Sequence, residues 1–339
     1  MPAKDGVQFR LKLADGEAII PSEPTTIAAD RSFVWPFNFD LGDGVTLDYA
    51  TAQLVCQIDA DDATYTLFTS TGNAAEFSVA GHVTRVSRTG LSPALTIAEP
   101  GKRVHKLLLL SEAETDRLYK DKLFGRDRLL LTDAGVIVDD DRLQLTPPAS
   151  PATIALLPAP PTLQANDQTI GGQADGAFQR FEFAARACKS ITAIATPVRP
   201  AGELRTIRIG VAGVAAQPAD ADFAHAAEWR IDIAADQPTD RRLMLRVHYV
   251  GDVARLYAGD RLITDNFYNG TPFDIGLWRI DPAALQNGLT LKILPLQQDA
   301  PIHLLDAVRP DFGNKPAVAE LLDVQLTEPV ELIATADFL

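Results

Sequence analysis

The sequence predicts an all-β chain with two antiparallel β-sandwich domains, the second of them jelly-roll-like, and one or two short helices. Short runs of alternating apolar and polar residues dominate the chain, and clusters of Gly, Pro, Asp and Asn separate them. The turns recur about every ten residues, which is typical of a sandwich. Only two segments have helical character.

The predicted strands are runs whose side chains alternate between the two faces of a sheet. In the first half they cover residues 7–13, 50–58, 63–70 and 82–88. In the second half they cover residues 206–214, 228–234 and 289–296. The segment Leu245–Arg279 adds two Gly-Asp pairs and a group of aromatic residues, and it predicts a series of hairpins that present polar loops.

Two segments are expected to be helical. The first, residues 111–122, opens with Ser111 as N-cap and Glu114 three residues later, the pair that forms a capping box. The second, Asp220–Ala227, is long enough for at most two turns.

A proline-rich segment marks the expected domain boundary. Six prolines lie between Pro147 and Pro161, and polar, glycine-containing residues follow. Because proline lacks an amide donor and fixes φ, such a region suits an interdomain connection better than a central strand. We therefore expect a first sandwich over residues 1–160, a linker over 158–172 and a second sandwich over 173–339.

The composition limits the classes of partner. The formal net charge is −14, from 45 acidic and 31 basic residues. This charge disfavours nucleic acid and acidic membrane surfaces, because each contact would bring like charges together. No apolar run approaches the roughly 20 residues that span a bilayer, so a soluble chain is expected. The N-terminal residues lack the apolar core of a signal peptide, which predicts a cytoplasmic protein or a part of a longer exported one.

No cofactor or metal is expected. The histidines show no metal-type spacing, and Cys56 and Cys188 lie in apolar runs that predict buried thiols. Asp139–Asp141 is expected to be a solvated turn rather than a calcium site, and Asn269–Thr271 a hairpin turn rather than a glycosylation site. The sequence contains no G-x-S-x-G, P-loop or Rossmann signature.

Carboxylates crowd one part of the second half, which raises the question of a glycosidase with two carboxyl groups about 5 Å apart. Gly251-Asp252 and Gly259-Asp260 are expected to be turn pairs, in which Asp caps backbone amides and Gly supplies a positive φ. Asp265 precedes an Asn-Phe-Tyr-Asn-Gly loop, where it would bind loop amides or a ligand hydroxyl. The other carboxylates considered are Asp274, Glu76, Glu182 and Glu228.

Aromatic residues concentrate between Tyr249 and Trp278. Flat aromatic faces stack on the C–H faces of sugar rings, and Asp or Asn side chains bind hydroxyls. Strand alternation would bury about half of the rings in a core, and Tyr268 and Phe273 are those expected to be exposed in loops. The residues expected to form a carbohydrate site are Tyr249, Asp252, Asp265, Tyr268 and Asn269.

Several stretches resemble bacterial β-galactosidases of glycoside hydrolase family 35, in the region that follows their catalytic barrel. The most specific are Tyr249–Tyr257 (YVGDVARLY), Asp265–Gly270 (DNFYNG) and Ile275–Arg279 (IGLWR). Further matching stretches are Phe33–Asp40, Leu47–Cys56 and residues 111–133. The resemblance implies accessory β-sandwiches beside a catalytic barrel in cis or in trans, without the barrel glutamates that cleave the sugar. Such a barrel needs about 250 residues of alternating strands and helices, a pattern that this sequence lacks.

The leading hypothesis is therefore a non-catalytic accessory protein that binds a galactoside weakly or supports a glycoside hydrolase barrel. One alternative is a self-sufficient glycoside hydrolase in which Asp265 acts with Asp252 or Glu228 as general acid and base. The other alternative is an assembly module whose partner is a barrel subunit or a second copy. A large exposed apolar patch would favour that module.

Overall fold

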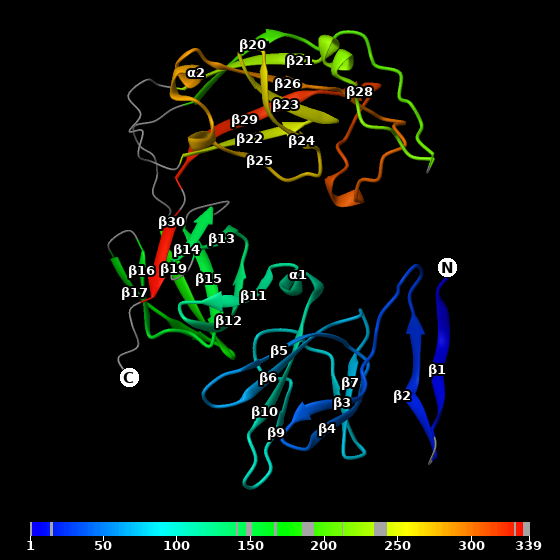
Figure 1. Cartoon of the computed structure of the whole chain (residues 1–339). Helices are drawn as coiled ribbons and strands as arrows, with labels where there is room; N and C mark the ends of the chain where they lie inside the picture. The colour runs from blue at the N-terminus through cyan, green and yellow to red at the C-terminus, as the bar shows by residue number, and fades with distance from the viewer. Residues whose placement is uncertain are drawn as a thin grey trace. The chain divides into compact units, whose positions relative to one another are not determined.

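The computed structural model describes residues 2–13, 16–139, 142–146, 151–165, 168–184, 193–211, 213–233, 243–328 and 330–334. Strands dominate these residues and the helices are short, so the predicted all-β class is confirmed. The chain divides into two compact units, Met1–Ala184 with Val330–Leu339, and Ala185–Pro329. Figure 1 shows the strands of each unit.

In the first unit, a four-stranded sheet is covered on both faces. Its strand order is β5 (Gln53–Asp59), β6 (Thr64–Thr69), β10 (His105–Leu110) and β9 (Leu95–Ile97). One face packs through Phe68, Leu107 and Leu109 on Leu47 and Phe77 of a second sheet. That sheet has the order β3 (Phe37–Gly42), β4 (Val45–Ala50), β7 (Ala75–Val79) and β8 (His82–Val86).

The opposite face of the same sheet also meets a partner. Leu67 and Leu108 pack there on Leu129, Leu157 and Phe178. Every residue of β6 is buried, as are all residues of β10 except Lys106. Strands covered on both faces lose the alternation of a half-exposed strand, which explains the unbroken leucine run of β10.

Strands β6 and β10 run parallel, with His105 beside Thr64 and Leu110 beside Thr69. The expectation of purely antiparallel sheets is wrong for this pair. The other strand pairs of the described residues are antiparallel. A parallel pair requires a long connection, which the intervening β7, β8 and β9 provide.

Two five-stranded sheets complete the first unit. One has the order β11 (Leu118–Leu123), β12 (Arg126–Thr132), β15 (Ala152–Leu157), β19 (Phe178–Phe183) and β18 (Gln173–Asp175). The other has the order β13 (Gly135–Asp139), β14 (Arg142–Thr146), β30 (Val330–Ala334), β16 (Thr162–Ala165) and β17 (Gln168–Gly171). Strand β17 contacts β19 of the first of these sheets.

The domain organisation differs from the expectation in two respects. Residues 158–172, expected to be a linker, contain the strands β16 and β17. The preceding strand β15 is central in its sheet, which is possible because the neighbouring prolines flank the strand and none lies within it. Strand β30 returns from the far end of the sequence and inserts between β14 and β16, so the first unit is discontinuous.

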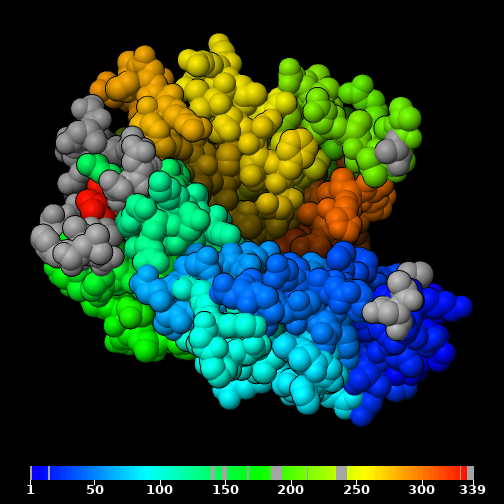
Figure 2. All heavy atoms as spheres, turned by 60° about the horizontal axis from the view of Figure 1, so that its bottom comes forward, coloured from blue at the N-terminus to red at the C-terminus, as the bar shows by residue number. Residues whose placement is uncertain are grey.

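A separate hairpin is formed by β1 (Lys4–Leu13) and β2 (Gly16–Ile27). These strands pair only with each other among the described strands, and the register is interrupted near Val7. In Figure 2 the hairpin, in dark blue, lies at the surface of the first unit.

The second unit is a sandwich of a five-stranded and a three-stranded sheet. The larger has the order β20 (Ala193–Arg199), β21 (Ala227–Ile233), β26 (Leu289–Ile293), β23 (Val253–Ala258) and β24 (Arg261–Phe267). The smaller has the order β25 (Phe273–Gly276), β22 (Met244–Val250) and β29 (Glu320–Thr327). Their facing side chains form one core that includes Ile231, Val247, Leu256, Phe273 and Leu291. A short pair, β27 (Leu296–Gln297) and β28 (Ala317–Val318), lies at one end.

The helices are shorter than the sequence suggests. The capping box of Ser111 and Glu114 is confirmed, but α1 (Glu112–Thr115) is one turn long because residues from Leu118 onward pair with β12. The prediction of a helix over 111–122 is therefore wrong beyond its first turn. Asp220–His225 forms a 3-10 turn (η1), as expected for the second helical segment. The remaining short helices are η2 (Leu277–Arg279), α2 (Pro282–Gln286) and η3 (Asp306–Val308).

Residues 206–214 do not form the predicted strand. Their described part makes one isolated bridge, from Ile209 to Ala215, and the side chains of Ile209, Val211 and Val214 are exposed. Alternation alone predicts a strand here, but no neighbouring sheet covers its apolar face. The other predicted strands lie in or overlap β1, β5, β6, β8, β21 and β26.

Gly251 is required for close packing rather than for its backbone angle. A Cβ at this position would lie 2.4 Å from Ile293 Cγ2 and 2.9 Å from the carbonyl oxygen of Leu294. The expectation of a positive φ is confirmed at Gly259, where φ is +58°, but Gly251 is not among the positive-φ residues. The first Gly-Asp pair is therefore a contact point between β23 and β26.

We expect Gly251→Ala to lower the free energy of unfolding of the second unit by about 2 kcal/mol, because the added methyl group overlaps the β26 chain. Urea titration monitored by tryptophan fluorescence measures this loss. Gly210→Ala in the same unit is the control, since its nearest neighbour would lie at an ordinary 3.5 Å. Equal stability of the two variants would contradict the packing role of Gly251.

Candidate functional site

The residues of the predicted carbohydrate site lie on β22, in the bend between β22 and β23, on β24 and in the loop after β24, but they differ widely in exposure. Tyr249 is buried in the core of the second unit. Its hydroxyl lies 2.9 Å from the carbonyl oxygen of Asn266 and 2.8 Å from Asn266 Oδ1, and its ring meets Tyr268 edge-on at 5.7 Å. Burial raises the pKa of Tyr249 well above its usual value. Tyr249 thus stabilises the fold and presents no face to solvent.

Asp252 is held in a buried ion pair. Its Oδ2 lies 2.8 Å from Arg205 Nη2, and the two side chains are only 11% and 8% exposed. Its carbonyl oxygen accepts a hydrogen bond of 2.9 Å from the N–H of Tyr268. Asp252 therefore joins the loop that carries Arg205 to the edge of the sandwich, instead of capping a turn.

Asp265 and Asn269 lie at the surface in different roles. Asp265 faces Arg255 across the β23–β24 pair, with 4.0 Å between Arg255 Nε and Asp265 Oδ2. Asn269 Oδ1 accepts hydrogen bonds from the N–H and the hydroxyl of Thr271, at 3.0 and 2.6 Å. The turn predicted at Asn269–Thr271 is present, but it connects β24 to β25 of the other sheet rather than to a hairpin partner.

The aromatic rings are distributed differently from the prediction. Phe273, expected in a loop, begins β25 and packs in the core. Tyr268 is half-buried, and its hydroxyl donates to the carbonyl oxygen of Val308 at 3.1 Å. Phe267, at 54%, and Trp278, at 43%, are the more exposed rings of this group. The exposure of Phe267 follows from alternation along β24, because Phe267 and Asp265 point to the same, solvent-facing side of the strand.

Glu228, one of the carboxylates proposed for an acid and base pair, and Asp274, another carboxylate considered from the sequence, have cationic partners. Glu228 Oε2 lies 3.1 Å from Arg199 Nη2 and 3.9 Å from Lys292 Nζ. Asp274 forms a two-pronged pair with the buried Arg246, at 2.8 Å for both contacts. The oxygens of both carboxylates are therefore already engaged by cationic side chains.

One open depression of about 450 Å³ borders the predicted residues. Tyr268 and Gly270 form one side, and residues 307–311 form another; Val250, Val318 and Glu320 complete its lining. Tyr268 is the member of the predicted set that reaches this depression. Arg309 also lines it, and its exposed guanidinium has no hydrogen-bonding partner among the described residues. No sequence signal identifies Arg309, which lies in an irregular segment without a recognisable motif.

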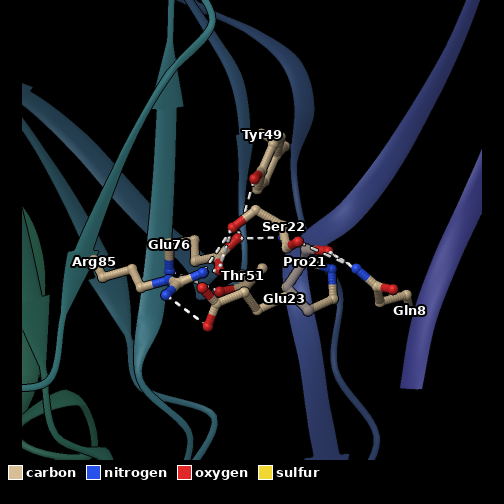
Figure 3. Close-up of polar contacts among 8 residues, drawn as sticks. All are labelled: Gln8, Pro21, Ser22, Glu23, Tyr49, Thr51, Glu76 and Arg85. Carbon is tan, nitrogen blue, oxygen red and sulfur yellow. Dashed lines mark hydrogen bonds and ion pairs between the residues drawn. The ribbon is translucent and has the colours of Figure 1, made fainter. Parts of the chain in front are cut away.

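A second polar site lies in the first unit, around the buried Glu76 of β7 (Figure 3). Its Oε2 accepts hydrogen bonds from the Ser22 N–H at 2.7 Å and the Tyr49 hydroxyl at 3.0 Å. Its Oε1 accepts from the Ser22 hydroxyl at 2.8 Å and from Arg85 Nε at 3.1 Å. Arg85 also pairs with Glu23 of the hairpin at 2.7 Å. Glu76 therefore fastens β2 to the β4-β7-β8 sheet.

The protonation of this site follows from its contacts. Burial opposes the charge of Glu76, but hydrogen bonds from Ser22, Arg85 and Tyr49 outweigh it, so the pKa of Glu76 lies below its usual value. Burial, together with the hydrogen bond to Glu76 and its negative charge, raises the pKa of Tyr49 to about 12. With its oxygens fully engaged, Glu76 is a structural group.

A pocket of about 220 Å³ lies beside this network. It is lined by Trp35, Asn73 and Arg85 and by four residues of β2, which are Pro21, Glu23, Pro24 and Thr25. Trp35 stacks on Phe33 at 4.4 Å and meets Phe9 of β1 edge-on at 5.7 Å. Asn73 donates a hydrogen bond of 2.7 Å to the carbonyl oxygen of Thr26. These contacts hold the base of the hairpin.

Other expectations concern thiols, metals and membranes. Cys56 is half-buried and unpaired, and burial raises the pKa of its thiol; Cys188, Asp140 and Asp141 lie outside the described residues. Within the described ranges, no three His, Cys, Asp or Glu side chains are grouped as metal ligands. No helix in the described part of the chain has the length and hydropathy needed to cross a bilayer.

We expect Glu76→Gln to destabilise the first unit by about 2 kcal/mol at pH 7, since it removes a charged acceptor of four hydrogen bonds. Because the pKa of Glu76 is lowered in the folded state, the charged carboxylate contributes its full share to the free energy of unfolding above about pH 4.3, the ordinary glutamate pKa. This contribution is lost as the pH falls through the folded-state pKa. The stability gap between the two proteins should therefore narrow in acid. Urea titrations at several pH values, with the exposed Glu182→Gln as control, measure this gap; a gap independent of pH would exclude the assigned role.

We expect Arg205→Ala to destabilise the second unit by about 3 kcal/mol, because the nearly buried carboxylate of Asp252 loses its cation. The exposed Arg208→Ala is the matched control and should change stability by less than about 0.5 kcal/mol. Thermal unfolding followed by circular dichroism distinguishes the two. A similar midpoint for both variants would show that the ion pair contributes little.

The chain matches no protein-family model and no curated protein sequence. The resemblance to glycoside hydrolase family 35 therefore stays a prediction that rests on the quoted residues.

Proposed function

We propose that the chain is a non-catalytic β-sandwich protein that binds a saccharide weakly, as an accessory to a glycoside hydrolase. The observation that carries this proposal is the depression beside Tyr268, where the guanidinium of Arg309 has no hydrogen-bonding partner among the described residues. Its volume of about 450 Å³ falls within the range of about 300–1,000 Å³ usual for small-ligand sites. Two-sheet jelly-roll sandwiches also occur in lectin domains, which is an argument by fold analogy alone.

The chemistry of the lining suits hydroxyl groups. Arg309 presents uncommitted N–H donors, and Glu320 and Asp311 present carboxylate acceptors. Glu320 Oε1 shares its charge with Lys315 Nζ at 2.9 Å, and Asp311 Oδ1 accepts from the Gly313 N–H at 2.8 Å. Because the depression is open, a bound sugar would keep much of its surface in water. Binding near the millimolar range follows, which corresponds to about −4 kcal/mol.

The ion pairs of the second unit favour binding over catalysis. Asp252 and Glu228 are each committed to at least one cation, so neither is placed to supply a proton. The residues that would contact a bound saccharide are therefore Tyr268, Arg309, Asp311 and Glu320. Of the five residues predicted from the sequence, this set keeps Tyr268.

Titration of the ¹⁵N-labelled chain with galactose and lactose tests the proposal. We expect fast-exchange shifts of the amides of Tyr268, Gly270 and Arg309, and an at least tenfold weaker affinity for Arg309→Ala. Arg261→Ala, at another exposed arginine of the same unit, should bind as the unmodified chain does. Absence of shifts, or shifts unaffected by Arg309→Ala, would exclude this site, and hydrolysis of a chromogenic galactoside by the purified chain would exclude the non-catalytic role.

A further inference from the structure

The hairpin of β1 and β2 has two different faces. Opposed residues of an antiparallel pair share a face, and the register pairs Phe9 with Ile20, Leu11 with Ala18 and Leu13 with Gly16. These residues form an apolar face. The other face carries Arg10, Lys12, Glu17 and Ile19.

The base of the hairpin is held by contacts, whereas the described residues nearest its turn, here called the tip, are partly exposed. Ile20 is buried, Phe9 meets Trp35, and Ser22 is bound by Glu76. Toward the tip, the side chains of Leu11, Leu13 and Ile19 are 37–43% exposed. A two-stranded hairpin is at best marginally stable by itself in water, and further strands or packing are needed to stabilise it. The tip has neither within the described chain.

The two edges of the hairpin are not equivalent. On β2, Pro21 and Pro24 have no N–H to donate, and the N–H of Ser22 is used by Glu76. No described strand pairs with the outer edge of β1, and residues 9–13 of this strand contain no proline or glycine. The edge of β1 is therefore the one that can accept another strand.

The polar positions within residues 9–13 of β1, Arg10 and Lys12, are cationic, in a chain whose net charge is −14. Arg10 Nη1 pairs with Glu17 Oε1 of β2 at 2.9 Å, but its side chain remains 66% exposed. Lys12 has no ion-pair partner among the described residues. An added strand would lie on the side of β1 away from Glu17, where acidic side chains would meet both cations.

A second copy of the chain is a poor occupant of this edge. An antiparallel pairing of two β1 strands centred on Leu11 uses the regular segment 9–13 and places Arg10 opposite Lys12, which is a like-charge contact. A pairing centred on Phe9 extends into the residues where the register of β1 is irregular and where Gly6 has a φ of +65°.

From this geometry we propose that the edge of β1 binds an extended segment of a partner protein in which aliphatic and acidic residues alternate. The segment adds as a third strand through main-chain hydrogen bonds, its aliphatic side chains continue the Phe9, Leu11 and Leu13 face, and its carboxylates lie opposite Arg10 and Lys12. This interaction surface is independent of the saccharide proposal.

Fluorescence polarisation with the full chain tests the proposal. The probe is a fluorescein-labelled peptide of four Val-Glu repeats between terminal serines, and the matched control has Lys in place of each Glu. We expect the Glu peptide to bind at least tenfold more tightly than the Lys peptide. A Glu peptide N-methylated at every valine and glutamate, which cannot donate main-chain hydrogen bonds from either edge, should lose binding.

Charge reversal provides the decisive variant. Arg10→Glu combined with Lys12→Glu should weaken binding of the Glu peptide at least tenfold and create binding of the Lys peptide, while Lys12→Glu alone should have an intermediate effect. Arg208→Glu combined with Arg279→Glu changes the net charge equally at exposed sites in the second unit and should leave binding unchanged. Thermal melting verifies that each variant folds.

Three results would overturn the proposal. They are equal binding of the Glu and Lys peptides, binding unaffected by the reversal of Arg10 and Lys12, and binding unaffected by N-methylation. Sedimentation equilibrium should show a monomer; a dimer that dissociates in the charge-reversed variant would identify a second copy as the occupant instead.

Discussion

The first unit depends on one constraint: its central sheet is apolar on both faces and must be covered on both. Strands β6 and β10 expose almost nothing, and Leu107–Leu110 contribute to two different cores. Burial of one leucine side chain contributes roughly 2 kcal/mol, so this run is a major source of the stability of the unit. The sheet containing β4 and β7 and the sheet containing β12 and β15 are positioned by this requirement.

Ion pairs attach peripheral segments to the sheets of each unit. Arg85 pairs with Glu23 of the hairpin and with Glu76 of its own sheet, which also binds Ser22 of the hairpin. Asp252 with Arg205 connects an irregular loop to the second sandwich. In each case a buried or nearly buried carboxylate, Glu76 of β7 or Asp252 in the bend before β23, holds a neighbouring segment. This explains why carboxylates that look available in the sequence are committed in the fold. Arg309 is different because nothing in the described chain competes for it.

Alternation was sufficient to predict the fold class and most strands, because one-sided burial leaves a period of two in the sequence. It failed at residues 206–214, where the pattern exists without a covering sheet, and it could not indicate the parallel partnership of β6 and β10. The capping box at Ser111 was readable locally, but the length of α1 depends on the distant strand β12. The candidate site also depends on tertiary contacts that alternation does not indicate. Tyr249 and Asp252 have side chains suited to a sugar, and only their tertiary partners, Asn266 and Arg205, show that they are engaged elsewhere.

The position of β30 has a consequence for the order of biosynthesis. This strand separates β14 from β16 in the finished sheet, yet it follows the whole of the second unit in the chain. During translation the ribosome releases residues 142–165 long before residues 330–334, so β14 and β16 wait with unpaired edges while the second unit is made. The second sandwich can fold as it emerges, whereas the first reaches its final hydrogen bonding only after residues 330–334 have also been released.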